Sequence, residues 1–420
     1  MSQTAEHVRL IFVLLLIALG VALLARWAKL PYTLGLVVVG LLIGIFHLLP
    51  GITLTPDLVL FIFLPALLFE DAWNIEQREL LRNWLPIALL AGPGLGISII
   101  IVGLILHAAV GLSWAVALLL GAILSPTDPV AVIALLRQLG IATRLRILIE
   151  GESLFNDGVA AALAQVLLAL ALGSAAAGAG AASPGGGQIA GAVFLSLLQL
   201  MGGGIALGVV IGYLVSRLVR YVHDPLIETT ITAVVAYGAY LLAESVHVSG
   251  ILAVITAALI LGSFGRQTGM AAHTQQAVDT VWGFAGYLAN SLLFLLMGLE
   301  LSRFPLTQAL SAILWGVLSV IAGRALMISL LFPCYNLIAG RLAGTKYRAW
   351  IAPGQVPRRW RLLLLFSGLR GALSLALALS LPLTTPNLNE LILIVYGVVL
   401  VTLLGQGFGL RFLLPLFQRE

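Results

Sequence analysis

Residues 148–172 read LIEGESLFNDGVAAALAQVLLALAL, an apolar stretch long enough to cross a membrane that nevertheless carries acids near its start. The polar residues near its start are Glu150, Glu152, Ser153, Asn156 and Asp157. A second apolar stretch is interrupted by SPTDP at residues 125–129. An ionisable group at membrane depth is costly and indicates a functional site by default. These two segments therefore mark the candidate functional site of the chain.

The composition indicates a membrane protein. Hydrophobic residues make up 61% of the 420 residues, charged residues make up 9%, and the mean hydropathy is +1.11. A soluble domain contains about 25% charged residues, so this chain could not cover a globule with polar surface. Its length allows about a dozen spans of roughly 20 residues each. We therefore predict an all-α polytopic membrane protein.

Other features of the composition exclude several classes of protein. The net charge of +5 is explained by membrane orientation, so we expect no binding of nucleic acid. The single cysteine, Cys334, permits neither an intramolecular disulfide nor a metal cluster. Residues 1–7 lack the basic segment and cleavage site of a signal peptide, so the first apolar stretch is predicted to be a retained span.

Hydropathy predicts thirteen spans, with twelve or fourteen as alternatives because two pairs are nearly fused. The spans are 9–26, 32–50, 56–73, 85–110, 113–136, 148–172, 189–216, 226–244, 247–263, 279–300, 307–338, 362–381 and 388–415. Sixteen Lys and Arg residues follow odd-numbered spans, and only Arg303 follows an even-numbered one. This asymmetry supports thirteen spans in a cell (inner) membrane, with the N-terminus outside and the C-terminus in the cytoplasm.

The order of the spans predicts an internal repeat within one membrane transporter domain. The uncharged connection 173–188 is rich in Gly, Ala and Ser, and we interpret it as an external linker. With span 189–216 as a spacer, residues 9–172 and 226–415 form two six-helix halves of opposite orientation. Inverted repeats of this kind are typical of secondary transporters.

Each half contains a helix-breaking sequence in its fifth span. The first half has SPTDP at 125–129, and the second has SGLRG at 367–371. Proline removes backbone donors, and freed backbone groups are tolerated in a membrane only where protein or a water-filled cavity satisfies them. We therefore predict that helices 5 and 12 are discontinuous.

The acids near the first break can bind a monovalent cation. Oxygen ligands for Na⁺ are available from the Asp157 and Asp128 carboxylates, the Ser153 hydroxyl, and the hydroxyl or carbonyl of Thr127. The same carboxylate binds a proton when the cation leaves, and this competition couples the two ions. The alternative is that both aspartates only pair with Arg370 and hold the helices together.

Three further residues are predicted to support this site. Glu152 needs a cationic partner, and we expect a structural ion pair with Arg370, with direct ion coordination by Glu152 as the alternative. Asn156 is expected to position Asp157 or to stabilise a broken helix end. As an amide it has no titratable charge.

Two charged residues lie outside these motifs. Glu70 is expected near the cytoplasmic end of span 3, where it lines the inward funnel and contributes to the site, or is simply solvated. Arg324 lies within span 11 and needs a partner, for which Glu300 and Glu244 are the candidates.

The motifs together resemble a known family. They are LPALLFE at 64–70, SPTDPVAV at 125–132, EGESLFNDG at 150–158 and GLRGA at 368–372. This set is similar to that of the prokaryotic NhaP-type sodium/proton antiporters, which belong with the animal sodium/proton exchangers to the monovalent cation:proton antiporter group. The resemblance covers essentially the whole chain.

The resemblance implies thirteen spans, broken helices that cross near the site, and a homodimer in membrane lipid. It implies exchange of Na⁺ or Li⁺ for H⁺ without a cofactor, and an electroneutral cycle because Asn precedes the essential Asp. It implies cation coordination at Thr127, Asp128, Ser153 and Asp157, with Glu70 close by and Glu152 paired with Arg370. Compared with the animal exchangers, we expect no cytoplasmic regulatory tail after about 415 and no control by tail-binding proteins.

Three other functions compete with Na⁺/H⁺ exchange. A cation channel could use the same acids, but the inverted broken helices and the absence of a filter-like loop argue against it. An intramembrane enzyme would need a Ser/His or paired-Asp arrangement across spans, and no histidine is expected at depth near Ser153 or Ser125. K⁺/H⁺ exchange on the same fold is the alternative to Na⁺/H⁺ exchange, because sequence does not reveal ion size selection.

Overall fold

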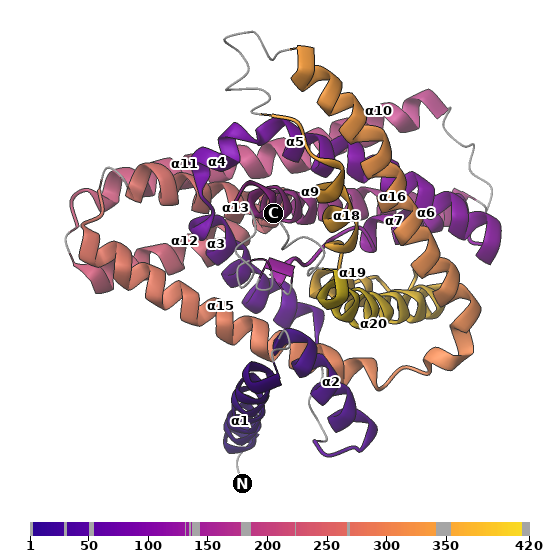
Figure 1. The fold of residues 1–420 in the computed structure, drawn as a ribbon, viewed down its shortest axis with the longest axis horizontal. Coiled ribbons are helices and arrows are strands. Elements are labelled where there is room, and N and C mark those ends of the chain that lie inside the picture. Colours follow the sequence, from indigo (N-terminus) through magenta and orange to yellow (C-terminus); the bar gives the residue numbers. More distant parts are fainter. Residues whose placement is uncertain are drawn as a thin grey trace.

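The protein is an all-helical membrane protein in the part of the chain that the structure describes (Figure 1). The structure is a computed structural model, and it describes residues 3–28, 32–49, 54–130, 132–133, 136, 143–177, 186–222, 224–266, 269–341 and 354–413. Within these ranges, eight helices are long and apolar enough to cross a membrane, and three shorter apolar helices accompany them.

Helices or helix pairs of the described chain lie in each of the thirteen predicted stretches. The first half contains α1 (Gln3–Ala28), α2 (Tyr32–Ile45), η1 (Leu58–Phe63), α3 (Leu64–Asn74), α4 (Gln77–Arg82), α5 (Trp84–Leu89), η2 (Leu90–Gly94), α6 (Leu95–Val110), α7 (Trp114–Ile123) and α9 (Thr143–Ala177). The remainder contains α10 (Gly186–Leu197), η3 (Leu198–Gly202), α11 (Gly203–Val219), α12 (Pro225–Ser245), α13 (Gly250–Ile260), η4 (Leu261–Gly265), α15 (Ala272–Leu301), η5 (Leu306–Ala309), α16 (Leu310–Arg341), α18 (Arg358–Phe366), α19 (Ala372–Leu379) and α20 (Leu388–Leu413).

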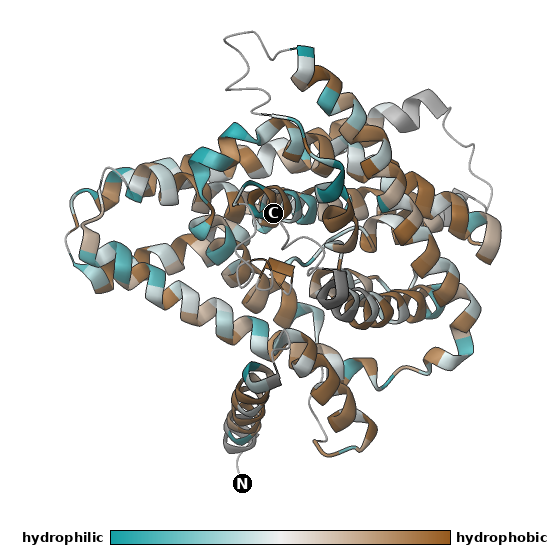
Figure 2. Cartoon of the chain, viewed as in Figure 1, coloured by the Kyte–Doolittle hydropathy of each residue, from teal (hydrophilic) through white to brown (hydrophobic). Residues whose placement is uncertain are grey.

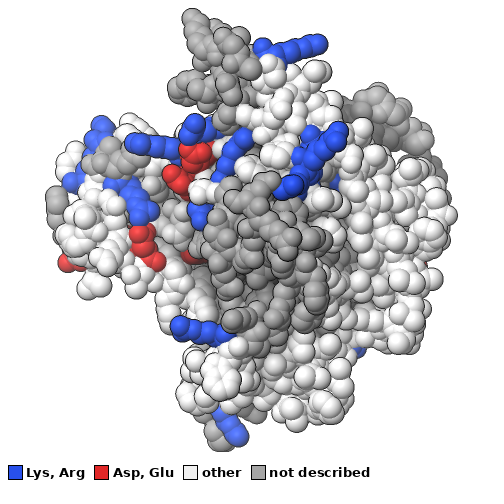
Figure 3. Space-filling model, viewed as in Figure 1, with Lys and Arg blue, Asp and Glu red and all other residues white. Residues whose placement is uncertain are grey.

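The outer surface has the character expected of a protein in lipid. Hydrophobic residues run along most of the helix lengths in Figure 2, and large apolar side chains such as Phe12, Leu24 and Leu214 are more than half exposed. Charged side chains gather over the upper and left parts of the face shown in Figure 3, whereas its lower right part is almost free of them. Backbone polar groups inside helices need no lipid-facing partner, which is why this architecture is stable in a bilayer.

The helices form two packed groups. In one, which we call the scaffold group, α2, α3 and α12 pack against α15, and α13 packs against α3, α11 and α12. In the other, the crossing group, α6 packs against α7 and α16, α7 against α9, and α20 against α16 and α19. The two groups meet mainly where α9 and α19 approach α3, α13, η1 and α15.

Two helices are broken, as the sequence predicted. Helix α7 ends at Ile123, and residues 124–129 continue without helical structure, while α18 and α19 are separated by residues 367–371. Of the predicted linker 173–188, residues 178–185 lie outside the described residues, whereas 173–177 belong to α9 and 186–188 belong to α10. Most of the second half of span 5 also lies outside the described residues. The two breaks touch, because the backbone N–H of Asp128 donates to the carbonyl oxygen of Leu369 at 2.8 Å. We call this meeting point the crossing.

The scaffold group depends on close contact between α2 and α15. A Cβ atom at Gly298 would overlap the carbonyl oxygen of Val37, and one at Gly40 would overlap that of Leu295. Both obstructing atoms are backbone, so neither can turn aside as a flexible side chain could. Small residues that let helix backbones approach are a common means of helix association in membranes.

We therefore expect Gly298→Ala to destabilise the protein by ~1–3 kcal/mol, the usual cost of overpacking. Thermal unfolding in detergent measures the effect. Gly238→Ala is the matched control, since a Cβ at this helical position meets nothing within 4 Å. An unchanged melting temperature for Gly298→Ala would contradict the close helix contact.

Candidate functional site

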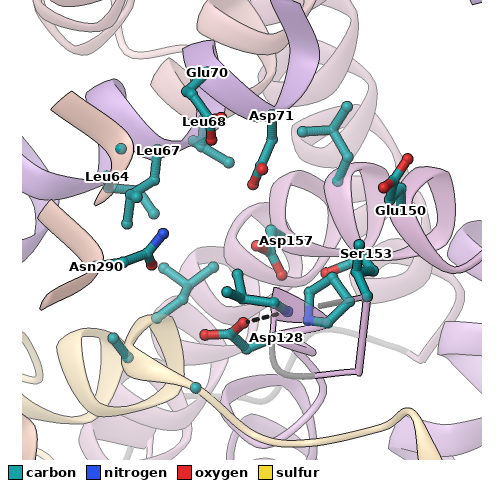
Figure 4. A pocket seen from close by; sticks show the side chains of 18 of the residues that line it. Leu64, Leu67, Leu68, Glu70, Asp71, Asp128, Glu150, Ser153, Asp157 and Asn290 are labelled. Atoms are coloured by element: carbon teal, nitrogen blue, oxygen red, sulfur yellow. Dashed lines mark hydrogen bonds between the residues drawn. The ribbon is translucent and has the colours of Figure 1, made fainter. Parts of the chain in front are cut away.

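A cavity of about 310 Å³ lies between the scaffold group and the crossing (Figure 4). Its walls come from α3, residues 126–130, α9, α15 and the start of α19. Five of the residues that the sequence predicted for the site line it, namely Glu70, Thr127, Asp128, Ser153 and Asp157. The fold therefore brings together the predicted cation-binding residues from three segments that are distant in sequence.

Helix α9 presents Ser153 and Asp157 one turn apart, on the face that meets the first break. The Ser153 hydroxyl donates to the backbone carbonyl oxygen of Thr127, and the Thr127 backbone N–H donates to the Asp157 carboxylate. The Asp157 Oδ1 atom is buried without a hydrogen-bond partner among the described residues. A carboxylate oxygen in this position can accept either a cation or a proton.

Asp128 enters the cavity from the break itself. Its backbone N–H is bonded across the crossing to Leu369, and its Oδ1 atom accepts from the backbone N–H of Val130 at 3.0 Å. Pro129, which has no N–H, lies between the two bonded residues. The interrupted helix therefore fixes the carboxylate at the cavity wall beside Asp157 (Figure 4).

Asn156 faces away from this cavity and holds the broken helix end. Its amide nitrogen donates to the carbonyl oxygen of Ser125 at 3.0 Å and reaches the Thr127 hydroxyl at 3.4 Å. The side chain is buried. The Ser125 carbonyl lies in the non-helical break after α7, so this amide satisfies a backbone acceptor that no helix pairs.

The prediction that Glu152 forms an ion pair with Arg370 is wrong. Both carboxylate oxygens accept from Arg324 of α16, each at 2.9 Å, in a bidentate pair whose side chains are 3% and 6% exposed. Arg324 also donates from Nε to the carbonyl oxygen of Leu364. The candidates Glu300 and Glu244 for Arg324 are wrong as well, and Glu300 pairs with Arg303 at 3.3 Å. Helix α16 brings Arg324 to α9 because it packs against η2, which in turn packs against α9.

Arg370 is therefore not the ion-pair partner of Glu152, although it lies close to Glu152 and Asp157. Its Nη1 atom donates to the carbonyl oxygen of Ser125 at 3.2 Å, and its buried Nε atom has no hydrogen-bond partner among the described residues. It attracts Glu152 and Asp157 electrostatically and is repelled by Arg324. The second break therefore contributes a guanidinium that interacts with the acids of α9.

Glu70 and its neighbour Asp71 both reach the cavity. Glu70 accepts from the Asn74 amide at 2.7 Å, and Gly286 of α15 packs against it. The Asp71 carboxylate points into the cavity toward Asp157 (Figure 4). Sequence reasoning missed Asp71, although a second acid directly after Glu70 was a visible signal.

Sequence reasoning also missed Asn290 of α15 and Glu150 of α9, which line the same cavity. Five carboxylates are among the described lining residues, and neither Lys, Arg nor His is among them. A cleft lined by charges of one sign with low-dielectric walls focuses the field and raises the local concentration of counter-ions. The cavity is therefore suited to cations.

Comparison with known proteins shows the family of the chain. The family model described as sodium/hydrogen exchanger, transmembrane, matches residues 12–415. The chain belongs to this exchanger family. The Na⁺/H⁺ antiporter ApNhaP of Aphanothece halophytica is 39% identical over 97% of this chain and 74% of its own. The antiporter NhaP of Pseudomonas aeruginosa is 34% identical over 85% of this chain and 80% of its own.

The fold of this exchanger is also that of a solved structure. The sodium proton antiporter MjNhaP1 from Methanocaldococcus jannaschii at pH 8 matches with a TM-score of 0.72 at 19% identity. The match covers 99% of this chain and all of that one. The arrangement of helices is thus shared with an antiporter whose sequence has diverged widely.

Breaking the Glu152–Arg324 pair should be costly. We expect Glu152→Gln and Arg324→Leu each to lower the free energy of unfolding by ~3–5 kcal/mol, because each leaves a buried charge unpaired. The double variant should lose less than the two single changes added together. Thermal melts in detergent measure this coupling.

The exposed pair Glu79–Arg82, with a 2.6 Å contact, supplies the control, and its removal should cost less than ~1 kcal/mol. A coupled loss for Glu152→Gln with Arg370→Leu, but strict additivity with Arg324→Leu, would contradict the pairing described above.

Proposed function

We propose that this protein is a secondary active antiporter that exchanges Na⁺, or Li⁺, for H⁺ across the cell membrane. The observation that carries the proposal is the pair of carboxylates, Asp128 and Asp157, at the cavity wall beside two broken helices. The unbonded Asp157 oxygen is available to a small ion. The names of the relatives, which are Na⁺/H⁺ antiporters, favour Na⁺ over K⁺ as the cargo.

In this proposal the cation binds to oxygens of Asp157, Asp128, Ser153 and Thr127, with Glu70 at the entrance. The Ser153 hydroxyl donates its proton to the Thr127 carbonyl, so its oxygen lone pairs remain for a cation. Hard cations take oxygen ligands of these kinds. When the cation leaves, a proton takes its place on the carboxylate, and the two ions compete for one site.

The charges around the crossing support an electroneutral exchange. Glu152 and Arg324 cancel each other as a bidentate pair. The other charged side chains at the crossing itself are Asp128, Asp157 and Arg370, whose charges sum to −1 when all three are ionised. One monovalent cation or one proton neutralises this sum, and moving a neutral site through the membrane avoids the cost of a buried net charge. One cation is then exchanged for one proton.

Alternating access would come from motion of the crossing group relative to the scaffold group. The cavity reaches the ends of α3 and α9 that lie next to Arg78 and Arg146, which the charge asymmetry assigns to the cytoplasm. We therefore take this arrangement as open to the cytoplasm, with the N-terminus outside. Two inverted repeats, 9–172 and 226–415, and a homodimer complete the proposal.

Asp157→Asn should reduce Na⁺-driven proton movement to the level of empty liposomes, because the variant amide neither binds a proton nor carries the charge that attracts the cation. Asp128→Asn should be nearly as severe. Dequenching of a pH-sensitive dye in proteoliposomes measures the flux, with Na⁺, Li⁺ and K⁺ added in turn.

Asp57→Asn is the control, since this exposed acid at the start of η1 does not line the cavity. Size-exclusion elution should be the same for all three variants. Residual exchange by Asp157→Asn above the empty-liposome baseline would overturn the site, and a wild-type response to K⁺ alone would replace Na⁺ by K⁺ as the cargo.

Electroneutrality is tested by clamping the membrane potential with valinomycin and K⁺. The initial Na⁺-driven proton flux should be unchanged between zero and about −100 mV, since one net charge would be worth ~2.3 kcal/mol over that range. A flux that changes several-fold with potential would require a second proton for each cation.

A further inference from the structure

The wall of the cavity opposite the crossing carries an amide that the mechanism above does not use. Asn290 lies on α15, where it interrupts an apolar run, and its side chain points into the cavity across from Asp128 and Asp157 (Figure 4). A polar side chain in the middle of a membrane-spanning helix is expected to face a partner or a cavity rather than lipid. Here it faces the cavity.

The side-chain amide of Asn290 is also available to bind an ion in the cavity. Among the described residues, no side chain or backbone group is bonded to it, whereas its neighbour Ser291 donates to the Tyr287 carbonyl oxygen of its own helix at 2.7 Å. An asparagine amide offers one oxygen acceptor and two N–H donors. The oxygen of Asn290 therefore has no competing donor within the described part of the protein.

The crossing alone supplies few free oxygens. The Thr127 carbonyl accepts from Ser153, the Thr127 hydroxyl is reached by the Asn156 amide, and Asp128 Oδ1 accepts from Val130. A cation held only by these groups would have a one-sided ligand set. An additional neutral oxygen from the opposite wall would enclose the ion without adding to the five carboxylates of the cavity.

We propose that the side-chain oxygen of Asn290 is a ligand of the transported cation, supplied by the scaffold group while the other ligands come from the crossing group. This inference rests on the proposed cation exchange and adds a residue to its site. The bound cation then bridges the two helix groups. A neutral amide suits this place because it binds the cation without changing the charge balance at the crossing.

The test replaces Asn290 by Leu, which has a similar volume and no polar atom, and by Asp, which keeps an oxygen at the same position. In proteoliposomes, Asn290→Leu should raise the apparent KM for Na⁺ about tenfold, equivalent to ~1.4 kcal/mol, with the maximal rate within about twofold of wild type. Asn290→Asp should keep the KM within about threefold or lower it.

A second measurement follows binding without transport. Na⁺ should raise the melting temperature of the wild type in detergent relative to an equal concentration of choline, and Asn290→Leu should reduce this Na⁺-dependent shift. Thr280→Ala is the control, because this exposed hydroxyl on α15 is bonded to its own helix and does not line the cavity. It should behave as wild type in both measurements.

An unchanged KM in Asn290→Leu, or a lower maximal rate at unchanged KM, would overturn the inference, since a merely structural role produces the latter. If Asn290→Leu does not fold, Asn290→Ser replaces it in the test. The serine side chain is too short to bring its oxygen to the ion, so the same rise in KM is expected. A wild type that neither exchanges Na⁺ nor is stabilised by it would instead refute the proposed function.

Discussion

The backbone hydrogen bond from Asp128 to Leu369 is the contact on which the site depends. Each broken helix leaves backbone N–H and C=O groups without helical partners at a depth where lipid offers none. The bond between the two breaks pairs one donor of the first with one acceptor of the second. Two carbonyls of the first break accept from side chains of the crossing group. Ser125 accepts from Asn156 and Arg370, and Thr127 accepts from Ser153. The same contacts that stabilise the breaks thereby aim the carboxylates at the cavity.

The charged side chains around the crossing form two sets, one that stabilises the fold and one that lies at the ion site. On the side away from the cavity, Glu152 and Arg324 form a closed bidentate pair and contribute no net charge. Near the cavity, Arg370 offsets one of the two aspartates without forming an ion pair of that kind with either. If Glu152 had paired with Arg370, the aspartates would have faced the cavity with two uncompensated charges. Which arginine pairs with Glu152 therefore determines how many positive charges the two aspartates can bind.

The sequence predicted the helical class, both breaks and the meeting of Thr127, Asp128, Ser153 and Asp157, because prolines and charges in apolar spans require satisfied backbone groups and polar partners. It failed on the partner of Glu152. Arg324 and Arg370 are both buried bases at membrane depth, and only the packing of α16 against α6 decides between them. It also missed Asp71 and Asn290, since the rotation of α3 and α15 about their axes depends on the close approach of α2 to α15. Hydropathy alone carries no information on that rotation.

The two walls of the cavity belong to different helix groups. Asp128 and Asp157, the carboxylates of the proposed ion site, belong to the crossing group, and their hydrogen bonds to Leu369, Val130 and Thr127 would move with it. The opposite wall, with Glu70, Asp71 and Asn290, belongs to the scaffold group, which is held by backbone contacts between α2 and α15. Relative motion of the groups would separate these walls while leaving each internally intact. A cavity assembled from two rigid surfaces can therefore lose its access on one side without disturbing the hydrogen bonds that fix its acids.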